Sequence, residues 1–149
     1  LTEVLGDDNE MYTITYDANN LPTRVDEVYD GDVSYELLTY SDGKFVSSEG
    51  FIVEDGVTEK STKTTVTYNG DKISSVNMAG TDDDGATYED FLVFTDMETD
   101  DKNSPYNSLA FAFLDDIRIY FTPQNNITKI TSSVFGLPAT TTTYTYTYN

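Results

Sequence analysis

The chain has 149 residues, about the size of one domain, and its 27 acidic and 8 basic residues give a net charge of −19. A surface this acidic repels phosphate backbones and anionic headgroups, which excludes nucleic acids and the bilayer surface as partners. The sequence has no His and no Cys. This excludes a Cys nucleophile, a Ser-His-Asp triad, and metal sites built on thiolates or imidazoles.

Hydrophobic residues make up 38% of the chain and aromatic residues 13%, which is typical of a folded core and not of a disordered acidic tail. The high charge favours a soluble monomer. No apolar run approaches the roughly 20 residues that cross a membrane as a helix. We therefore predict a single domain over residues 1–149, with residues 1–10 as a loose N-terminal segment.

A repeated phrase sets the organisation of the chain. Residues 12–25 read YTITYDANNLPTRV, in which a tyrosine-ended strand is followed by a polar turn and a basic residue. The phrase returns as TYSDGKFV at 39–46, TYNGDKIS at 67–74 and YFTPQNNITKI at 120–130, and its first half returns as YTYTYN at 144–149. Steps of 24 to 28 residues separate the strand-ending aromatic residues, so each step is about one hairpin.

The turn residues between these strands are those that tolerate a positive φ. Asp-Gly and Asn-Gly pairs between alternating strands are strong hairpin signals. The predicted turns are at Asn19-Asn20, Asp30-Gly31, Asp42-Gly43, Asp55-Gly56, Asn69-Gly70 and Asn125-Asn126. The predicted strands are 11–16, 23–30, 33–40, 44–54, 57–68, 72–79, 86–95, 116–122, 127–135 and 140–148.

One segment departs from this pattern. Residues 104–113 begin with Ser104-Pro105, which suits the start of a helix, and a helix would place Tyr106, Leu109, Ala110 and Phe113 on one stripe. A strand is the alternative, because Leu109, Phe111 and Phe113 also alternate with alanines. We expect a short helix here.

Several strands are apolar on both faces, among them residues 88–94, so something must cover the second face of the sheet. We therefore predict an all-β fold: an antiparallel meander of about ten strands, strongly curved into an open or nearly closed barrel, with the 104–113 segment over one opening. A two-sheet β-sandwich is the alternative. The shared Tyr/Thr alternation also suggests that the first and last tyrosine strands are neighbours.

Two sets of charged residues are candidate binding sites. Arg24, Lys44, Lys72 and Lys129 each follow a turn; we expect them to pair with neighbouring carboxylates and not to bind an anionic partner. The stretch 82–101 has nine acidic residues and no cation, and calcium favours such oxygen ligands. Its spacing does not fit the helix-loop-helix calcium pattern, so a solvated loop is preferred. The candidate ligands for calcium are Asp82, Asp84, Glu89, Asp100 and Asp101.

Aromatic residues supply the other candidate site. Tyrosine stripes can stack on sugars or line an apolar pocket, although they also suit half-buried sheet surfaces. The candidate ligand-binding residues are Tyr12, Tyr16, Tyr144, Tyr146, Tyr148, Tyr106, Phe111 and Phe113. We expect the segment that interrupts the repeat, residues 82–116, to bear the binding function.

The phrases YTITYDANNLPTRV and TYNGDKIS resemble the YD-type units of bacterial cell-envelope proteins. Over most of residues 11–149, the chain resembles secreted lipoproteins of unknown function from Bacteroidetes, and Asn103-Ser104-Pro105 is similar to a segment that interrupts their repeat. The resemblance implies export to the periplasm or cell surface, with a lipid anchor upstream of Leu1. It implies no catalytic residues.

The sequence therefore predicts a non-enzymatic, exported cell-envelope protein that binds a glycan or a protein partner. The alternative is a carrier of a lipid or other apolar ligand in the concave face of a half-barrel, with Phe91, Val93, Phe111 and Phe113 lining the cavity. A glycosidase-like enzyme is less favoured, because close carboxylate pairs are unavoidable among 27 acids and so are not diagnostic.

Overall fold

The computed structural model describes residues 10–81, 87–102 and 125–147 in full, and the backbone alone of residues 2–6, 103, 112–114 and 117–119. No helix occurs in these ranges. Among them there is accordingly no helix long and apolar enough to cross a membrane.

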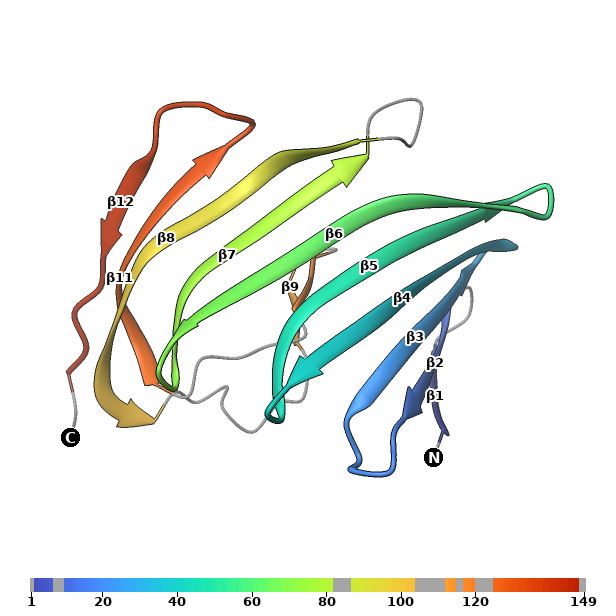
Figure 1. The fold of residues 1–149 in the computed structure, drawn as a ribbon, viewed down its shortest axis with the longest axis horizontal. Helices are drawn as coiled ribbons and strands as arrows, with labels where there is room; N and C mark the ends of the chain where they lie inside the picture. Colours follow the sequence, from blue (N-terminus) through green and yellow to red (C-terminus); the bar gives the residue numbers. More distant parts are fainter. Residues whose placement is uncertain are drawn as a thin grey trace. The chain divides into compact units, whose positions relative to one another are not determined.

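Ten strands form one antiparallel sheet, in the order β1-β2-β3-β4-β5-β6-β7-β8-β11-β12, and the short strands β9 and β10 pair with each other (Figure 1). Because β1 and β12 stand at the two ends of this order, the sheet is open. This confirms the predicted all-β meander and leaves no place for a two-sheet sandwich. The strands are β1 (Thr2–Gly6), β2 (Glu10–Tyr16), β3 (Pro22–Tyr29), β4 (Asp32–Ser41), β5 (Lys44–Glu54), β6 (Val57–Asn69), β7 (Lys72–Thr81), β8 (Tyr88–Asn103), β9 (Ala112–Leu114), β10 (Ile117–Ile119), β11 (Asn125–Val134) and β12 (Thr140–Thr143).

The Asp-Gly turns have the geometry that their residues predict. At Asp30-Gly31, Asp42-Gly43 and Asp55-Gly56, both residues have positive φ, with the aspartates between 49° and 51°. Two positive φ angles in a two-residue loop are the signature of the hairpin turn that matches strand twist. These three predicted turns are confirmed.

Three other expectations are corrected, and a fourth is tested only at its last two residues. Residues 2–6 are not loose, because they form β1 and pair with β2. Asn125-Asn126 is not a turn but the start of β11, where Asn126 is buried. The first and last tyrosine strands are not neighbours, because β2 pairs with β1 and β3 while β12 pairs with β11. Of the helix expected at 104–113, residues 104–111 lie outside the described residues. The last two residues, 112 and 113, belong to strand β9.

The chain divides into two compact units. Unit 1 comprises residues 1–65 and 78–89, and unit 2 comprises residues 66–77 and 90–149. Strands β6, β7 and β8 each contribute residues to both. Each unit is described separately below, and a single domain over residues 1–149 stays a prediction.

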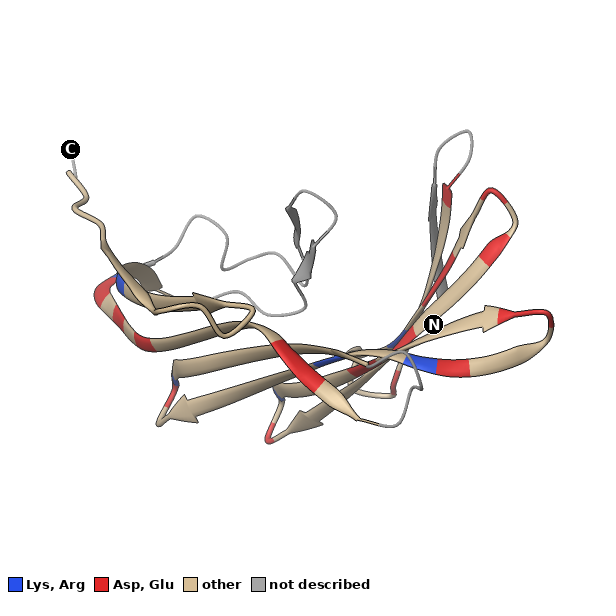
Figure 2. Cartoon of the chain, turned by 90° about the horizontal axis from the view of Figure 1, so that it is seen from above, with Lys and Arg blue, Asp and Glu red and all other residues tan. Residues whose placement is uncertain are grey.

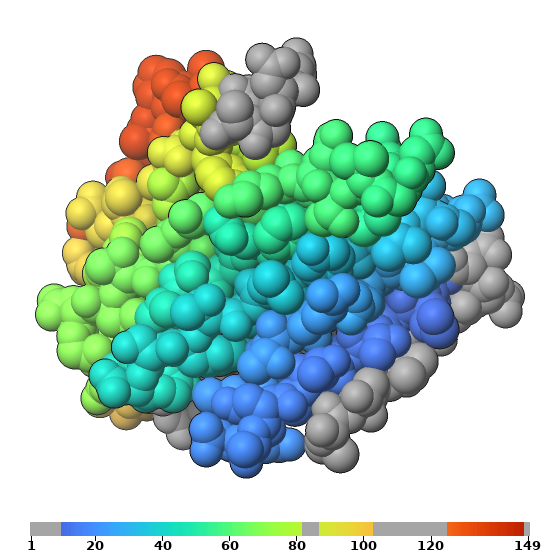
Figure 3. All heavy atoms as spheres, turned by 45° about the vertical axis from the view of Figure 1, so that its right-hand side comes forward, coloured from blue at the N-terminus to red at the C-terminus, as the bar shows by residue number. Residues whose placement is uncertain are grey.

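Unit 1 has one well-buried sheet face. Ile14 on β2 is paired with Val25 on β3 and Leu38 on β4 with Ser48 on β5, and all four side chains are buried. The buried Glu36 carboxylate accepts a hydrogen bond from the Ser48 hydroxyl, so the polar atoms on this face have partners. Figure 3 shows the strands of unit 1, from blue to green, packed side by side.

Gly50 on β5 is required by its neighbour on β6. A β-carbon at Gly50 would lie 2.2 Å from the Thr62 Oγ1 atom, well inside van der Waals contact. Beside it, the pairing of β5 with β6 shifts by one residue between Gly50 and Phe51, because Gly50 is paired with Thr62 and Phe51 with Lys60. The glycine therefore makes room for an irregularity in the ladder.

Unit 2 has a smaller described core. Val66 at the end of β6 and Ile73 and Val76 on β7 are its buried apolar residues, together with the polar Asn126 on β11. The exposed large apolar residues described in this unit all lie at its C-terminal end.

Candidate functional site

The tyrosines of β2 are not a solvent-open patch. Tyr12 and Tyr16 are half-buried. The Tyr12 hydroxyl donates to the Glu10 carboxylate and lies 3.0 Å from the Glu27 Oε1 atom, and the second oxygen of Glu27 accepts from Ser34. Tyr12 is thus part of a polar row across β2, β3 and β4. This is the packing role that tyrosine ordinarily takes on a half-buried sheet.

The tyrosines at the C-terminal end are different. Tyr144 and Tyr146 are 46% and 42% exposed. The Tyr146 hydroxyl donates a 2.9 Å hydrogen bond to the Ile127 carbonyl oxygen, which fixes its ring beside β11. The structure therefore separates the predicted tyrosine set into a packed pair in unit 1 and an exposed pair in unit 2. Tyr148 lies outside the described residues.

The predicted apolar cavity is not tested. Tyr106 and Phe111 lie outside the described residues, and Phe113 is described only by its backbone, on β9. Phe91 and Val93 on β8 are half-buried. The carrier of an apolar ligand therefore stays a prediction, as does binding by the segment 82–116.

The predicted calcium ligands do not come together where they are described. Glu89 belongs to unit 1, and Asp100 and Asp101 to unit 2. Asp100 accepts from the Lys102 amide at 2.9 Å and from the Asn126 Nδ2 atom at 3.2 Å, and Asp101 pairs with Lys102. The described part of the chain holds no group of three metal-ligating side chains. Asp82 and Asp84 lie outside it.

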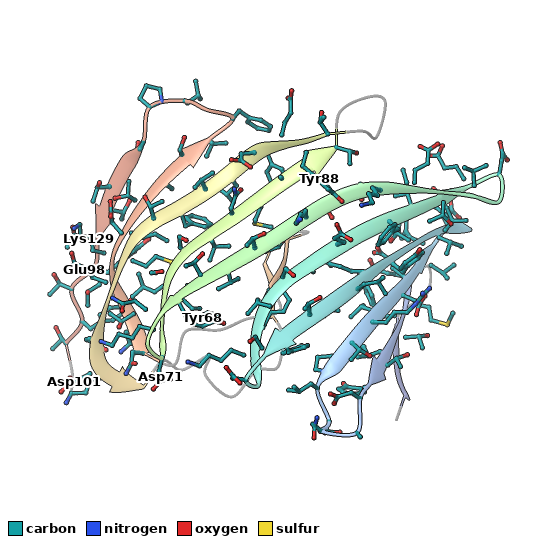
Figure 4. All side chains as sticks on the ribbon, in the orientation of Figure 1. Tyr68, Asp71, Tyr88, Glu98, Asp101 and Lys129 are labelled. Carbon is teal, nitrogen blue, oxygen red and sulfur yellow. The ribbon has the colours of Figure 1, made fainter. Side chains whose placement is uncertain are left out.

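Two of the turn-flanking cations pair with carboxylates, as predicted. Arg24 contacts Asp26 at 2.6 Å, and the Lys129 ammonium lies 2.7 Å from Glu98 (Figure 4). The hydrogen bond that Arg24 donates to Asp26 raises the pKa of Arg24, and the one that Lys129 donates to Glu98 raises the pKa of Lys129. These cations are neutralised within their own sheet.

A half-buried row in unit 1 joins one cation and two rings. The Arg24 guanidinium lies 3.9 Å from the centre of the Tyr35 ring, and Tyr35 stacks on Phe51 with centroids 4.8 Å apart. The Tyr35 ring thus has one face under the guanidinium and the other against a phenyl ring. A sugar that binds by stacking needs an open ring face, so Tyr35 does not offer such a platform.

Tyr88 begins β8 beside two lysines of β6 (Figure 4). The Lys60 and Lys63 ammonium groups lie 5.9 and 5.6 Å from its ring centre. Its hydroxyl is buried and has no hydrogen-bond partner among the described residues. Burial raises the pKa of Tyr88, the nearby Glu49 raises it further, and Lys60 opposes both. The two ammonium groups hold the ring by cation–π attraction.

The feature that departs most from the rest of the described chain is a run of exposed residues at its C-terminal end. Residues 134–147, here called the C-terminal arm, are all exposed. They include Phe135 and Leu137, which are 75% and 63% exposed, together with Val134 and the tyrosines 144 and 146. Val134, Phe135 and Leu137 lie together at the tip before β12, and Tyr144 and Tyr146 follow its other end. Single exposed apolar residues are ordinary, but three within four residues make the tip a candidate interaction surface.

The tip of the arm is held in a strained conformation. Phe135 has a φ of 48° and Gly136 a φ of 67°. A phenylalanine with positive φ is uncommon and costs of order 1 kcal/mol or more. The Phe135 amide donates to the Phe91 carbonyl at 2.8 Å, and the Leu137 amide donates to the Val134 carbonyl at 2.9 Å. These bonds keep the turn closed although the ring of Phe135 stays mostly in water.

The arm is also uncharged. No Asp, Glu, Lys or Arg occurs between Ile130 and Asn149, in a chain whose net charge is −19. The last charged residue is Lys129, which is paired with Glu98. In Figure 2 the hairpin of β11 and β12 carries no charged colour beyond this point, whereas other hairpins have red acidic turns. The arm is therefore the part of this surface that another protein can approach without meeting fixed negative charge.

Sequence reasoning placed Tyr144 and Tyr146 in a binding set but missed Val134, Phe135 and Leu137. The signal was present in the sequence. It is the charge-free run of 20 residues from Ile130 to Asn149, together with a Phe-Gly pair where three other turns have Asp-Gly. An apolar residue at the first turn position is not explained by turn chemistry, because Asp and Asn tolerate positive φ better.

Comparison with known proteins adds little. No protein-family model matches the chain, and no curated protein matches it. A solved structure of a DUF3836 family protein from Parabacteroides distasonis aligns with a TM-score of 0.48 and 18% sequence identity, over 75% of this chain and 89% of that one. This neighbour comes from a Bacteroidetes species, and its name assigns it no function. A likeness at this level carries no argument for the function of this chain.

Proposed function

We propose that this chain is a non-enzymatic, exported cell-envelope protein that binds a protein partner through its C-terminal arm. The observation that supports the proposal best is the arm itself, in which 14 consecutive residues are exposed and uncharged and include five large apolar or aromatic side chains. Partner surfaces are typically enriched in aromatic residues and depleted of charge at their centre.

The strained tip supports a protein partner in particular. Phe135 is 75% exposed, and its ring meets the Phe91 ring only at a tilted contact of 6.3 Å between centres, yet the backbone accepts an unfavourable φ to present it. Strain of this kind is retained where the side chain has a use outside the fold. Phe135 and Leu137 would enter an apolar pocket on the partner as anchors, as buried aromatic side chains do at interface hot spots.

Glycan binding is a second candidate, and it is favoured by one observation. The Tyr146 ring is fixed by its hydrogen bond to Ile127 while 42% of the residue stays exposed, and Tyr144 is exposed two residues before it. Rings held in this way can stack on sugars. Val134, Phe135 and Leu137 have no evident role in such a site, which makes the protein partner the better proposal.

Site-specific photo-crosslinking tests the proposal. A benzophenone amino acid in place of Phe135 should crosslink a partner protein in extracts of the source cells, and the same group in place of Val57 should not. Val57 is the matched control, because it is 57% exposed beside the turn of another hairpin. The captured protein should bind the purified chain, and the double variant Phe135→Asp, Leu137→Asp should weaken binding at least about tenfold.

The control variant Val57→Asp should leave this affinity unchanged. Equal loss from both variants, or crosslinking from position 57 alone, would overturn the arm as the docking element. If no protein is captured but Tyr144→Ala and Tyr146→Ala abolish binding to immobilised glycans, the glycan candidate replaces the protein partner.

A further inference from the structure

The C-terminal arm contains an edge of the sheet. Strand β12 stands last in the strand order, with β11 on one side (Figure 1). None of the other strands in the described ranges pairs with its second side. An edge strand presents backbone N–H and C=O groups in a row, and such a row is a template for another strand.

The register of β11 with β12 shows which groups point outward. Lys129 is paired with Thr143 and Thr131 with Thr141. The Tyr144 amide donates to the Thr128 carbonyl at 2.8 Å, so Tyr144 belongs to a hydrogen-bonded pair. Because hydrogen-bonded and non-hydrogen-bonded pairs alternate in an antiparallel ladder, Thr142 also points its amide toward β11. The amides and carbonyls of Thr141 and Thr143 therefore point away from β11, toward the open edge.

This edge is short, with four residues in β12, but it lacks three other devices that protect natural edges. These are a charge, a proline and a bulge, each of which discourages pairing. Residues 140–147 read TTTTYTYT and have none of the three, and the four β11–β12 pairs are in continuous register. The opposite edge strand, β1, has the sequence TEVLG and so carries the charge of Glu3. The contrast indicates that β12 is left open for a partner.

The charge around the edge selects the partner. Strand β8 of the same unit has three exposed acidic residues, Asp96, Glu98 and Asp101. Lys129 is paired with Glu98. A second copy of this chain brings another −19, so two copies repel each other as they approach. The best complement is therefore a strand that is uncharged where it pairs with the neutral β12 edge. Basic residues at its ends would be attracted by the acidic surroundings.

We infer that β12 accepts an extended strand from the partner protein by strand addition, with the outward groups of Thr141 and Thr143 forming the new ladder. This inference rests on the proposed function and names its mode. Main-chain hydrogen bonds give such complexes their affinity, and side chains at alternate positions give them specificity. The basic ends of the incoming strand are attracted by the net charge of −19 on this chain.

A designed peptide tests the mode directly. The probe is the synthetic peptide KKTVTVTVKK, and its control is the same peptide with N-methyl groups on alternate backbone amides of the central stretch. In the unbound protein, the Thr141 and Thr143 amides should exchange hydrogen faster than those of Thr142 and Tyr144. Saturating peptide at millimolar concentration should slow exchange at Thr141 and Thr143 at least about tenfold, and the N-methylated peptide should not.

Two variants of the protein test the same mode of binding with the unmodified peptide. Thr143→Pro removes an outward donor and leaves the inward ladder intact, so it should weaken peptide binding at least about tenfold. Thr143→Ser keeps the amide and should bind as the parent does. Retained slow exchange at the Thr142 and Tyr144 amides shows that the hairpin is intact in both variants.

The outcomes separate the two proposals. If Phe135→Asp with Leu137→Asp weakens the captured partner but Thr143→Pro does not, the arm docks the partner without strand addition and this inference is overturned. If neither change affects that partner, the proposed function falls as well. Unchanged exchange at Thr141 and Thr143 in saturating peptide overturns strand addition. A dimer that Thr143→Pro dissociates would show that the occupant is a second copy.

Discussion

The two hairpins β5–β6 and β11–β12 use the same turn geometry for different purposes. Asp55-Gly56 and Phe135-Gly136 both have two positive φ angles. The first tip has an aspartate, which tolerates that geometry. The two strands that flank it, β5 and β6, contain acidic and basic residues. The second tip has a phenylalanine and stems without charge after Lys129. The first hairpin follows turn chemistry, whereas the second keeps a residue that turn chemistry does not favour.

The contrast teaches where to look for function on a sheet of repeated hairpins. Positions that follow turn chemistry and strand alternation, such as Asp55 and Gly56, are explained by local physics. A position that breaks the local rule for little gain in packing is the better candidate for a functional site. Phe135 is such a position, because 75% of it stays exposed although its ring centre lies 6.3 Å from that of Phe91.

The largest expected effect compares the same substitution in the two hairpins. Phe45 is buried and meets the edge of Tyr40 at a centroid distance of 5.9 Å. Phe45→Ala should lower the free energy of unfolding by about 3–5 kcal/mol, because it leaves a cavity. Phe135→Ala should change it by less than about 1 kcal/mol, because the ring is mostly in water. Urea unfolding followed by circular dichroism measures both, and equal losses would contradict the comparison.

A smaller effect is expected from exchanging the tip residues. Phe135→Asn should raise the free energy of unfolding by about 0.5–1 kcal/mol, because asparagine adopts positive φ at lower cost. Asp55→Phe should lower it by about 1 kcal/mol for the opposite reason. Thermal unfolding of the two variants beside the parent gives the signs. A stability loss in Phe135→Asn would mean that the ring stabilises the fold and is not kept for a partner.

The smallest expected effect concerns acidification and involves the turn between β2 and β3. Asp17 Oδ1 accepts from the amides of Asn19 and Leu21 at 2.8 and 2.9 Å. The Leu21 hydrogen bond, with the Asn19 bonds, holds the pKa of Asp17 below its ordinary value of 3.8. A lowered carboxyl pKa means that the stabilisation is present above 3.8 and is lost as the pH falls through the folded pKa.

Amide chemical shifts of Asn19 and Leu21, followed from about pH 5 to pH 2, should therefore move together with a midpoint below 3.8. The amides at the tip of the C-terminal arm have no carboxylate in their own hairpin and should move less. In Asp17→Asn, the Asn19 and Leu21 shifts should lose the transition. A midpoint above 3.8 would contradict the assigned hydrogen bonds.

Much of the fold could be predicted because it depends on local chemistry. Tyr12, Ile14 and Tyr16 alternate with threonines, and Asp-Gly pairs fix turns at residues 30, 42 and 55, so the order of the meander followed directly. The errors came from long-range pairing. The similarity of the first and last tyrosine strands suggested that they were neighbours, but side-chain alternation says nothing about which strand a chain pairs with.

The candidate site was predicted only in part. Tyr12 and Tyr144 share the same alternation, yet the hydroxyl of Tyr12 is held by Glu27 on a paired strand while Tyr144 lies beside an open edge. Their difference depends on position in the sheet, which a short motif does not contain. Asn126 was misread for a related reason, because an Asn-Asn pair is a turn signal unless a partner such as Asp100 holds it within a strand.

The most direct test of the central claim is a hydrogen-exchange map of the whole chain with and without the captured partner. We expect slower exchange over residues 134–147, with Thr141 and Thr143 changing most, and no change in β3, β4 or β5. Protection confined to β3, β4 and β5, with the C-terminal arm unchanged, would contradict the account.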